Sequence, residues 1–149
     1  CEVVCDFDAI TMDDFSIPVV DTDKCTACGD CVEVCPKDLF SLEPVSHKLW
    51  VACKSLEAGD GVLEDCQVGC TACGKCAMDA PGDLIKMINN LPVINYSENH
   101  DTKVPIERCP TWAIVWLDDT SGAIQGRESK KIIRKGKRKM GLSSVHTLV

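Results

Sequence analysis

Four closely spaced cysteines constrain this chain of 149 residues more than any other feature. They lie in the run CTACGDCVEVCP, residues 25–36, whose spacing is C-x2-C-x2-C-x3-C followed by proline. This spacing is typical of bacterial ferredoxins, in which three thiolates on a tight loop bind one [4Fe-4S] cluster. Disulfides are disfavoured because neighbouring loop thiols seldom reach the Cβ separation that an S–S bond needs. Zinc prefers C-x2-C pairs with a longer spacer, so the run predicts an iron–sulfur cluster on Cys25, Cys28 and Cys31.

A second loop repeats this triple but has lost its own fourth cysteine. Its thiolates follow the same spacing: Cys70, Cys73 and Cys76. Ala80 stands before proline where the fourth cysteine would be, and Cys109 precedes a proline with no triple before it. The positions that would form that triple hold other residues: Asn99, Thr102 and Pro105. In paired ferredoxins the fourth cysteine of each run binds the other run's cluster. Loss of one cluster of the pair therefore predicts that Cys109 completes the site on the second loop.

The N-terminal cysteines show a related half-pattern. Cys1 and Cys5 have the spacing of the last two cysteines of a run, with Asp6 in place of proline. The same exchange rule predicts that Cys5 completes the cluster on the first loop. Cys35 then joins Cys1 at a third cluster, whose other ligands lie upstream or elsewhere. Two cysteines fit no run: Cys53 and Cys66. They either complete that third set or are buried structural thiols.

The composition points to a fold that depends on its clusters. The chain holds 12 cysteines and only 5% aromatic residues, so it has little apolar core, and we expect the apo protein not to fold. The expected fold is α+β of the bacterial ferredoxin type. The expected segments are a module over 1–46, a linker strand and helix over 47–69, a degenerate second module over 70–118 and a basic tail over 119–149. Strands are expected at 8–12, 18–21, 39–44, 48–53 and 113–118, helices at 29–35, 72–79 and 102–108, and a hairpin over 84–96 with Asn89-Asn90 at its turn.

Charge is divided unevenly along the chain. Residues 1–126 carry 8 Lys and Arg against 22 Asp and Glu, a net charge of −14, whereas residues 127–149 carry a net charge of +7. An acidic body argues against nucleic acid as the main partner and for docking on a basic protein surface. The basic tail is either a solvated arm on a larger partner or a site for RNA or anionic lipid. No apolar run approaches the roughly 20 residues of a membrane span. Because the chain begins at Cys1 without methionine, we expect further residues before it.

The order of the remaining motifs carries a family resemblance. A V-x-C strand ending at Cys53 is followed by a Gly-Asp-Gly loop, the second cysteine loop, NNLPVINY and RCPTWAI. Over about residues 1–118 this order resembles the iron–sulfur part of the B subunit of Rnf-type electron-transport complexes. It is also similar to electron-transfer subunits of anaerobic reductases, such as the tungsten-dependent benzoyl-CoA reductases. The resemblance implies a ferredoxin fold, [4Fe-4S] clusters and a wire-like role. Asp6, Ala80 and the missing triple depart from the family pattern and imply one cluster fewer than in a complete relative.

The expected function is electron transfer. The chain would pass single low-potential electrons through about three clusters, between a redox donor protein and a larger catalytic oxidoreductase subunit in a hetero-oligomer. It would not be catalytic alone, since no nucleophile–base pair, dinucleotide fingerprint or P-loop is seen. His100 in the degenerate loop is either a substitute ligand or a solvent-facing residue. The alternative function is a structural or regulatory iron–sulfur or zinc module that uses the basic tail as a binding arm. Reduced thiolates favour an anaerobic cytoplasm, with membrane association only through a complex.

Overall fold

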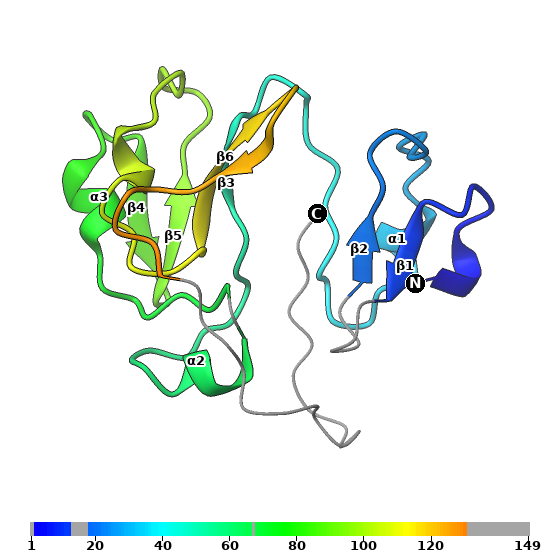
Figure 1. Ribbon diagram of the computed structural model, residues 1–149, viewed down its shortest axis with the longest axis horizontal. Coiled ribbons are helices and arrows are strands. Elements are labelled where there is room, and N and C mark those ends of the chain that lie inside the picture. The colour runs from blue at the N-terminus through cyan, green and yellow to red at the C-terminus, as the bar shows by residue number, and fades with distance from the viewer. Residues whose placement is uncertain (1, 13–17, 67, 131–149) are drawn as a thin grey trace. The chain divides into compact units, whose positions relative to one another are not determined.

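The computed structural model describes residues 2–12, 18–66 and 68–130, which fall into two compact units (Figure 1). The first unit runs through Glu43 and the second begins at Pro44. Each unit has an apolar core of its own. Cys1 and the basic tail after Lys130 lie outside the described residues.

The first unit is built on a two-stranded antiparallel sheet. Its elements in chain order are the 3-10 helix η1 (Glu2–Val4), strand β1 (Ile10–Met12), strand β2 (Pro18–Val20) and helix α1 (Asp30–Glu33). Its core consists of Ile10, Leu39 and Phe40, and three cysteines pack against it: Cys5, Cys31 and Cys35. Among the described residues, the strand predicted over 39–44 is absent. Leu39 and Phe40 are buried without strand pairing, because β1 and β2 pair only with each other.

The second unit combines a three-stranded sheet with a separate hairpin. Its helices are α2 (Val62–Asp65), α3 (Lys75–Asp79) and the 3-10 helix η2 (Val104–Ile106). Strands β3 (Leu49–Val51), β6 (Ile114–Asp118) and β7 (Gly122–Ile124) form an antiparallel sheet in the order β3-β6-β7. Strands β4 (Ile85–Ile88) and β5 (Leu91–Ile94) form the hairpin, with Ile88 opposite Leu91. The predicted turn is confirmed: Asn89 and Asn90 have φ of 48° and 68°, which a tight hairpin turn requires and asparagine tolerates.

Two of the expected segments contribute strands to one sheet of the second unit. The segment expected as a linker strand and helix over 47–69 contributes β3, which pairs with β6. The segment expected as a basic tail from 119 includes β7, which extends the same sheet. Beyond β7, the backbone N–H of Lys130 donates to the carbonyl of Pro110 at 3.0 Å. The β3–β6 pairing and the Lys130–Pro110 hydrogen bond join residues far apart in sequence, so the local pattern of each segment did not reveal them.

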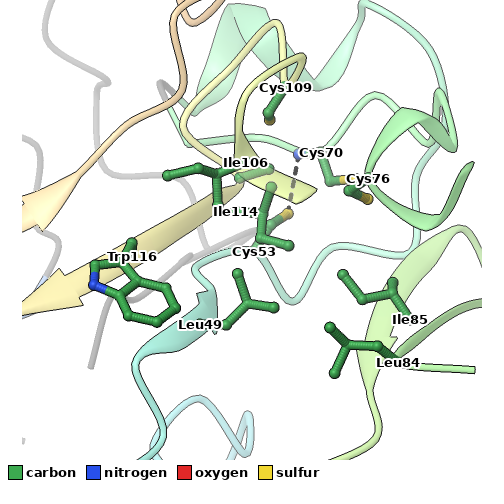
Figure 2. Packing of buried hydrophobic residues seen from close by; sticks show 11 residues of the cluster. Leu49, Cys53, Cys70, Cys76, Leu84, Ile85, Ile106, Cys109, Ile114 and Trp116 are labelled. Carbon is green, nitrogen blue, oxygen red and sulfur yellow. Dashed lines mark hydrogen bonds between the residues drawn. The ribbon is translucent and has the colours of Figure 1, made fainter. Parts of the chain in front are cut away.

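Cysteines form a large part of the core of the second unit. Eleven buried residues make up this core, and Figure 2 shows how they pack. Aliphatic side chains of the strands fill one part of it, among them Leu49, Ile85 and Ile114. Four cysteines fill the rest: Cys53, Cys70, Cys76 and Cys109. A core with so many thiols is incomplete unless those thiols have a binding partner.

Two candidate iron–sulfur sites

The first unit gathers four cysteines around one hollow. The loop between β2 and α1 supplies Cys25 and Cys28, the first turn of α1 supplies Cys31, and Cys5 follows η1. The hollow has a volume of about 490 Å³, opens to solvent and is lined elsewhere by apolar residues such as Phe7 and Leu42. Sequence reasoning grouped these same four cysteines, and the structure brings them together.

The second unit repeats this arrangement in a more buried form. Its hollow of about 320 Å³ is lined by Cys70 and Cys73 of the loop before α3, by Cys76 in the first turn of α3, and by Cys109, which follows η2. Cys73 is exposed, whereas the other three thiols are buried. Ala80, where the paired pattern would have a cysteine, packs instead against the apolar core. The second hollow therefore holds the four cysteines expected for a module that has lost its second cluster.

The backbone of both cysteine loops is shaped to face an anion. Ala27 and Ala72, each one residue before the second cysteine of its loop, have φ of 56° and 57°. Gly29 and Gly74, each one residue after that cysteine, have φ of 91° and 72°. Left-handed φ at alanine is uncommon and costs about 1–2 kcal/mol. When left-handed and right-handed backbone conformations alternate, successive N–H groups point into one concavity that binds an anion, as at many iron–sulfur sites. The two loops share this backbone, so both fit an anionic cluster.

Cys5 and Cys35 share a second local conformation. The N–H of Ala9 donates to Cys5 Sγ at 3.4 Å, and the N–H of Leu39 donates to Cys35 Sγ at 3.3 Å. Three residues after each cysteine an aspartate has φ of 50°. Partial burial of Cys35 opposes its ionisation, but the surrounding backbone N–H groups outweigh it and lower the pKa of the thiol. Cys35 thus has the same backbone hydrogen bond and the same following left-handed aspartate as Cys5, although it does not line the first hollow.

Burial governs the thiols of the second hollow. It raises the pKa of Cys70 to about 11 and that of Cys76 to about 12, and the neighbouring thiols add to the shift. Without iron these groups are therefore neutral at pH 7. Only a bound cation makes buried thiolates stable, because it removes the thiol protons and supplies the opposite charge.

The spacing of the cysteines favours a multi-iron cluster over a single zinc ion, because each loop carries three cysteines at C-x2-C-x2-C without the longer spacer of zinc sites. The described cysteines are also all free thiols, with no disulfide among them.

Two further cysteines lie in the core but line neither hollow. Cys53 and Cys66 are 2% and 0% exposed. Cys53 Sγ accepts a hydrogen bond from the N–H of Cys70 at 3.2 Å (Figure 2). It also accepts one from the N–H of Ser55 at 3.4 Å. Cys53 therefore contacts the backbone of a residue that lines the second hollow.

His100 also lies outside both hollows. Its ring stands edge-on to the rings of His47 and Tyr96, with centroids 5.4 Å apart in each case. Its Nδ1 lies 3.0 Å from the carbonyl oxygen of Glu98. The structure thus gives His100 an aromatic setting and not the surroundings of a substitute ligand.

An ion pair that sequence reasoning missed joins the two halves of the second site. Arg108 Nε donates to Asp79 Oδ2 at 2.7 Å, and a second guanidinium nitrogen contacts the other carboxylate oxygen. The hydrogen bond and charge of Arg108 lower the pKa of the Asp79 carboxyl. Asp79 is the last residue of α3 and Arg108 precedes Cys109. The two hydrogen bonds of this ion pair therefore connect the helix after the cysteine loop to the segment that carries the fourth cysteine. A salt bridge between residues 29 positions apart has no local sequence signal.

Comparison with known proteins agrees with this chemistry. Residues 18–40 match the family described as a 4Fe-4S binding domain. Over 25 residues the chain is 52% identical to Ferredoxin-2 of Desulfomicrobium norvegicum, covering 17% of this chain and 42% of that one. The protein is thus an iron–sulfur protein of the ferredoxin type, with a small α+β fold, that binds [4Fe-4S] clusters.

Longer matches identify a more particular likeness. Over 110 residues the chain is 40% identical to the B subunit of the Na(+)-translocating ferredoxin:NAD(+) oxidoreductase complex of Acetobacterium woodii, covering 74% of this chain and 33% of that protein. Over 116 residues it is 41% identical to the B subunit of the proton-translocating ferredoxin:NAD(+) oxidoreductase complex of Clostridium ljungdahlii, covering 76% and 41%. These matches confirm that the chain is a polyferredoxin resembling the Rnf-type B subunit. It spans about a third to two fifths of the length of these relatives. No helix in the described part of the chain is long and apolar enough to cross a membrane.

Proposed function

We propose that this chain is an electron-transfer subunit that passes single electrons through [4Fe-4S] clusters between a redox donor and a catalytic partner subunit. One observation carries the proposal: each cysteine loop meets a fourth cysteine that is distant in sequence. Cys5 joins the first loop and Cys109 joins the second, and each completes a set of four around one hollow. Four thiolates leave no iron open for substrate, so the clusters are suited to electron exchange and the chain is not catalytic alone.

The first and second clusters would be held by the two sets of four. For the first, the ligands are Cys5, Cys25, Cys28 and Cys31. For the second, they are Cys70, Cys73, Cys76 and Cys109. The loop backbone would direct N–H groups toward the cluster sulfurs, and apolar lining residues would keep water away from them. When bound, each cluster supplies one-electron redox chemistry.

A third cluster would use Cys35 together with Cys1 and ligands from elsewhere. The support is the environment of Cys35, which has the backbone N–H bond and the following left-handed aspartate that Cys5 has. Because Cys35 does not line the first hollow, its prepared thiol is available to another cluster. Thiolate ligation further favours a reducing compartment, and we place the protein in the cytoplasm on that ground.

Iron and acid-labile sulfide analysis under anaerobic conditions tests the number of clusters. Three cubanes predict about 12 iron and 12 sulfide atoms per chain, with spin-coupled EPR signals in the reduced state. The variant Cys35→Ala should then lose about four of each. A wild-type content of about 8 and 8, unchanged by Cys35→Ala, would contradict the third cluster. Stoichiometric zinc with little iron, or clusters that do not cycle reversibly in a redox titration, would contradict electron transfer itself.

The partner surface should be basic and its encounter salt-dependent. Residues 1–43, the sequence of the first unit, carry 2 Lys against 11 Asp and Glu, a net charge of −9, and two cysteines of the hollow in this unit, Cys25 and Cys28, are exposed. Attraction of such a surface to a basic partner accelerates encounter and is screened by salt. We therefore expect the rate of electron exchange with the partner to fall about tenfold or more between low and high ionic strength, by stopped-flow absorbance. A rate that is constant or rises with salt would show that charge does not guide docking.

A further inference from the structure

The second site contains a buried hydroxyl group beside one of its cysteines. Thr111 lines the hollow and is 2% exposed. Its Oγ1 lies 3.7 Å from Cys109 Sγ, within the range of a hydrogen bond to sulfur. A buried hydroxyl whose proton has no acceptor is costly, so the hydroxyl of Thr111 is expected to donate a hydrogen bond to a neighbouring atom.

The neighbouring backbone fixes where the hydroxyl proton goes. The N–H of Ala113 donates to Thr111 Oγ1 at 3.2 Å, which uses the oxygen as an acceptor. A threonine hydroxyl keeps one proton to donate. In the described part of the chain, the acceptor within hydrogen-bond range of this hydroxyl proton is Cys109 Sγ. A thiolate bound to iron has no proton of its own, so in the loaded protein the bond runs from the Thr111 hydroxyl to the sulfur of Cys109.

The loop that carries both residues is held from outside. Ser129 Oγ lies 3.1 Å from the carbonyl oxygen of Cys109 and 2.9 Å from that of Thr111. The N–H of Lys130 donates to the carbonyl of Pro110 between them. The segment after β7 therefore fixes the backbone that sets the distance from hydroxyl to sulfur.

The other two cysteines of this type have no equivalent hydroxyl. Thr111 lies two residues after Cys109, whereas the corresponding residues after Cys5 and Cys35 are Phe7 and Lys37. A hydrogen bond to a ligand sulfur stabilises the reduced cluster, which carries one more negative charge, more than the oxidised cluster. We propose that Thr111 raises the reduction potential of the second cluster relative to the others. This inference rests on the proposed [4Fe-4S] ligation by Cys109.

An EPR-monitored redox titration of the anaerobic full chain tests this role. Thr111→Val keeps the shape of the side chain but removes the hydroxyl, and Thr111→Ala avoids any clash from the added methyl group. We expect both to shift the equilibrium of the second cluster about tenfold toward the oxidised form, or ~59 mV for a one-electron couple. Thr111→Ser keeps a hydroxyl and should retain a potential close to wild type. Thr11→Val, an exposed threonine of the first unit, makes the same chemical change away from the site and should shift nothing.

The outcomes separate potential tuning from a structural role. Iron content is measured on every variant, because a residue that only packs would lower iron content without moving the potential of the clusters that remain. Variants with full iron and an unshifted potential would overturn the proposal, as would Thr111→Ser shifting as far as Thr111→Ala. Should both Thr111→Val and Thr111→Ala lose iron, the test passes to wild-type protein exposed only briefly to D2O, where pulsed EPR should detect a rapidly exchanged hydroxyl deuteron close to the second cluster before the slower backbone amides exchange. Absence of that deuteron would then overturn the proposal. Failure of the proposed function is distinct, since wild type itself would show no reversible signal.

Discussion

Replacing Cys109 with alanine should remove about four iron atoms per chain and destabilise the whole second unit. Cys109 is the only one of the four cysteines at the second hollow that comes from outside the 70–76 loop. It is 7% exposed and lies in the same core cluster as Ile106 and Ile114. Loss of this thiolate would release the cluster and leave an unfilled hollow lined by neutral thiols in the core. Iron analysis and thermal unfolding by circular dichroism would measure both effects.

Cys66→Ala is a matched control for this change. Cys66 is even more deeply buried, at 0% exposed, but it lines neither hollow. Its loss should leave the iron content unchanged and lower the free energy of unfolding by about 1–2 kcal/mol, as for other small cavities in a core. A Cys66→Ala protein that also lost four iron atoms would make Cys66 a ligand and support the set formed with Cys1, Cys35 and Cys53. A Cys109→Ala protein with full iron content would refute the proposed second site.

The grouping of the cysteines was predictable because cluster ligation follows spacing. The missing cysteine at Ala80 and the isolated Cys109-Pro110 pair were enough to place Cys109 with the second loop, and the structure brings them together. The turn at Asn89-Asn90 was predictable for a similar reason, since few residues tolerate positive φ at two successive positions. Both predictions depend on requirements that act over a few residues, namely the cysteine spacing of a cluster loop and the positive φ of a tight turn.

The groups around the clusters were not predictable from sequence. The Asp79–Arg108 ion pair and the packing of residues 126–130 on the Cys109 loop join distant segments. The burial of Thr111 also depends on the folded unit. The strand predicted over 39–44 failed because its alternating pattern has no partner strand in a unit this small. What surrounds the cysteines is set by tertiary packing, which the spacing of the cysteines does not encode.

Removing iron from the wild-type protein should unfold the second unit. Its core contains four cysteines, and three of them also line the hollow that the cluster would fill. Binding of a structural metal contributes on the order of 10 kcal/mol to folding, which is comparable to the whole stability of a small domain. We therefore expect anaerobic treatment with a strong iron chelator to abolish the strand signal in circular dichroism. Hydrogen-exchange protection of β3 and β6 should be lost with it.

The stability of the iron-free protein should depend on pH through the buried thiols of the second site. Burial raises the pKa of Cys70 to about 11 and of Cys76 to about 12, above the value of 9.0 for a free thiol. The unfolded thiols lose their protons above about pH 9, whereas the folded thiols keep theirs until about pH 11 or 12. The free energy of unfolding is therefore highest below about pH 9 and falls as the pH rises toward 11 or 12. Apo protein kept reduced should thus be least structured at alkaline pH, and rebinding of iron at pH 7 should release protons as the thiols become thiolates. An apo protein with native exchange protection up to about pH 11 would show that the apolar side chains suffice to fold the unit, and the clusters would then act in electron transfer alone.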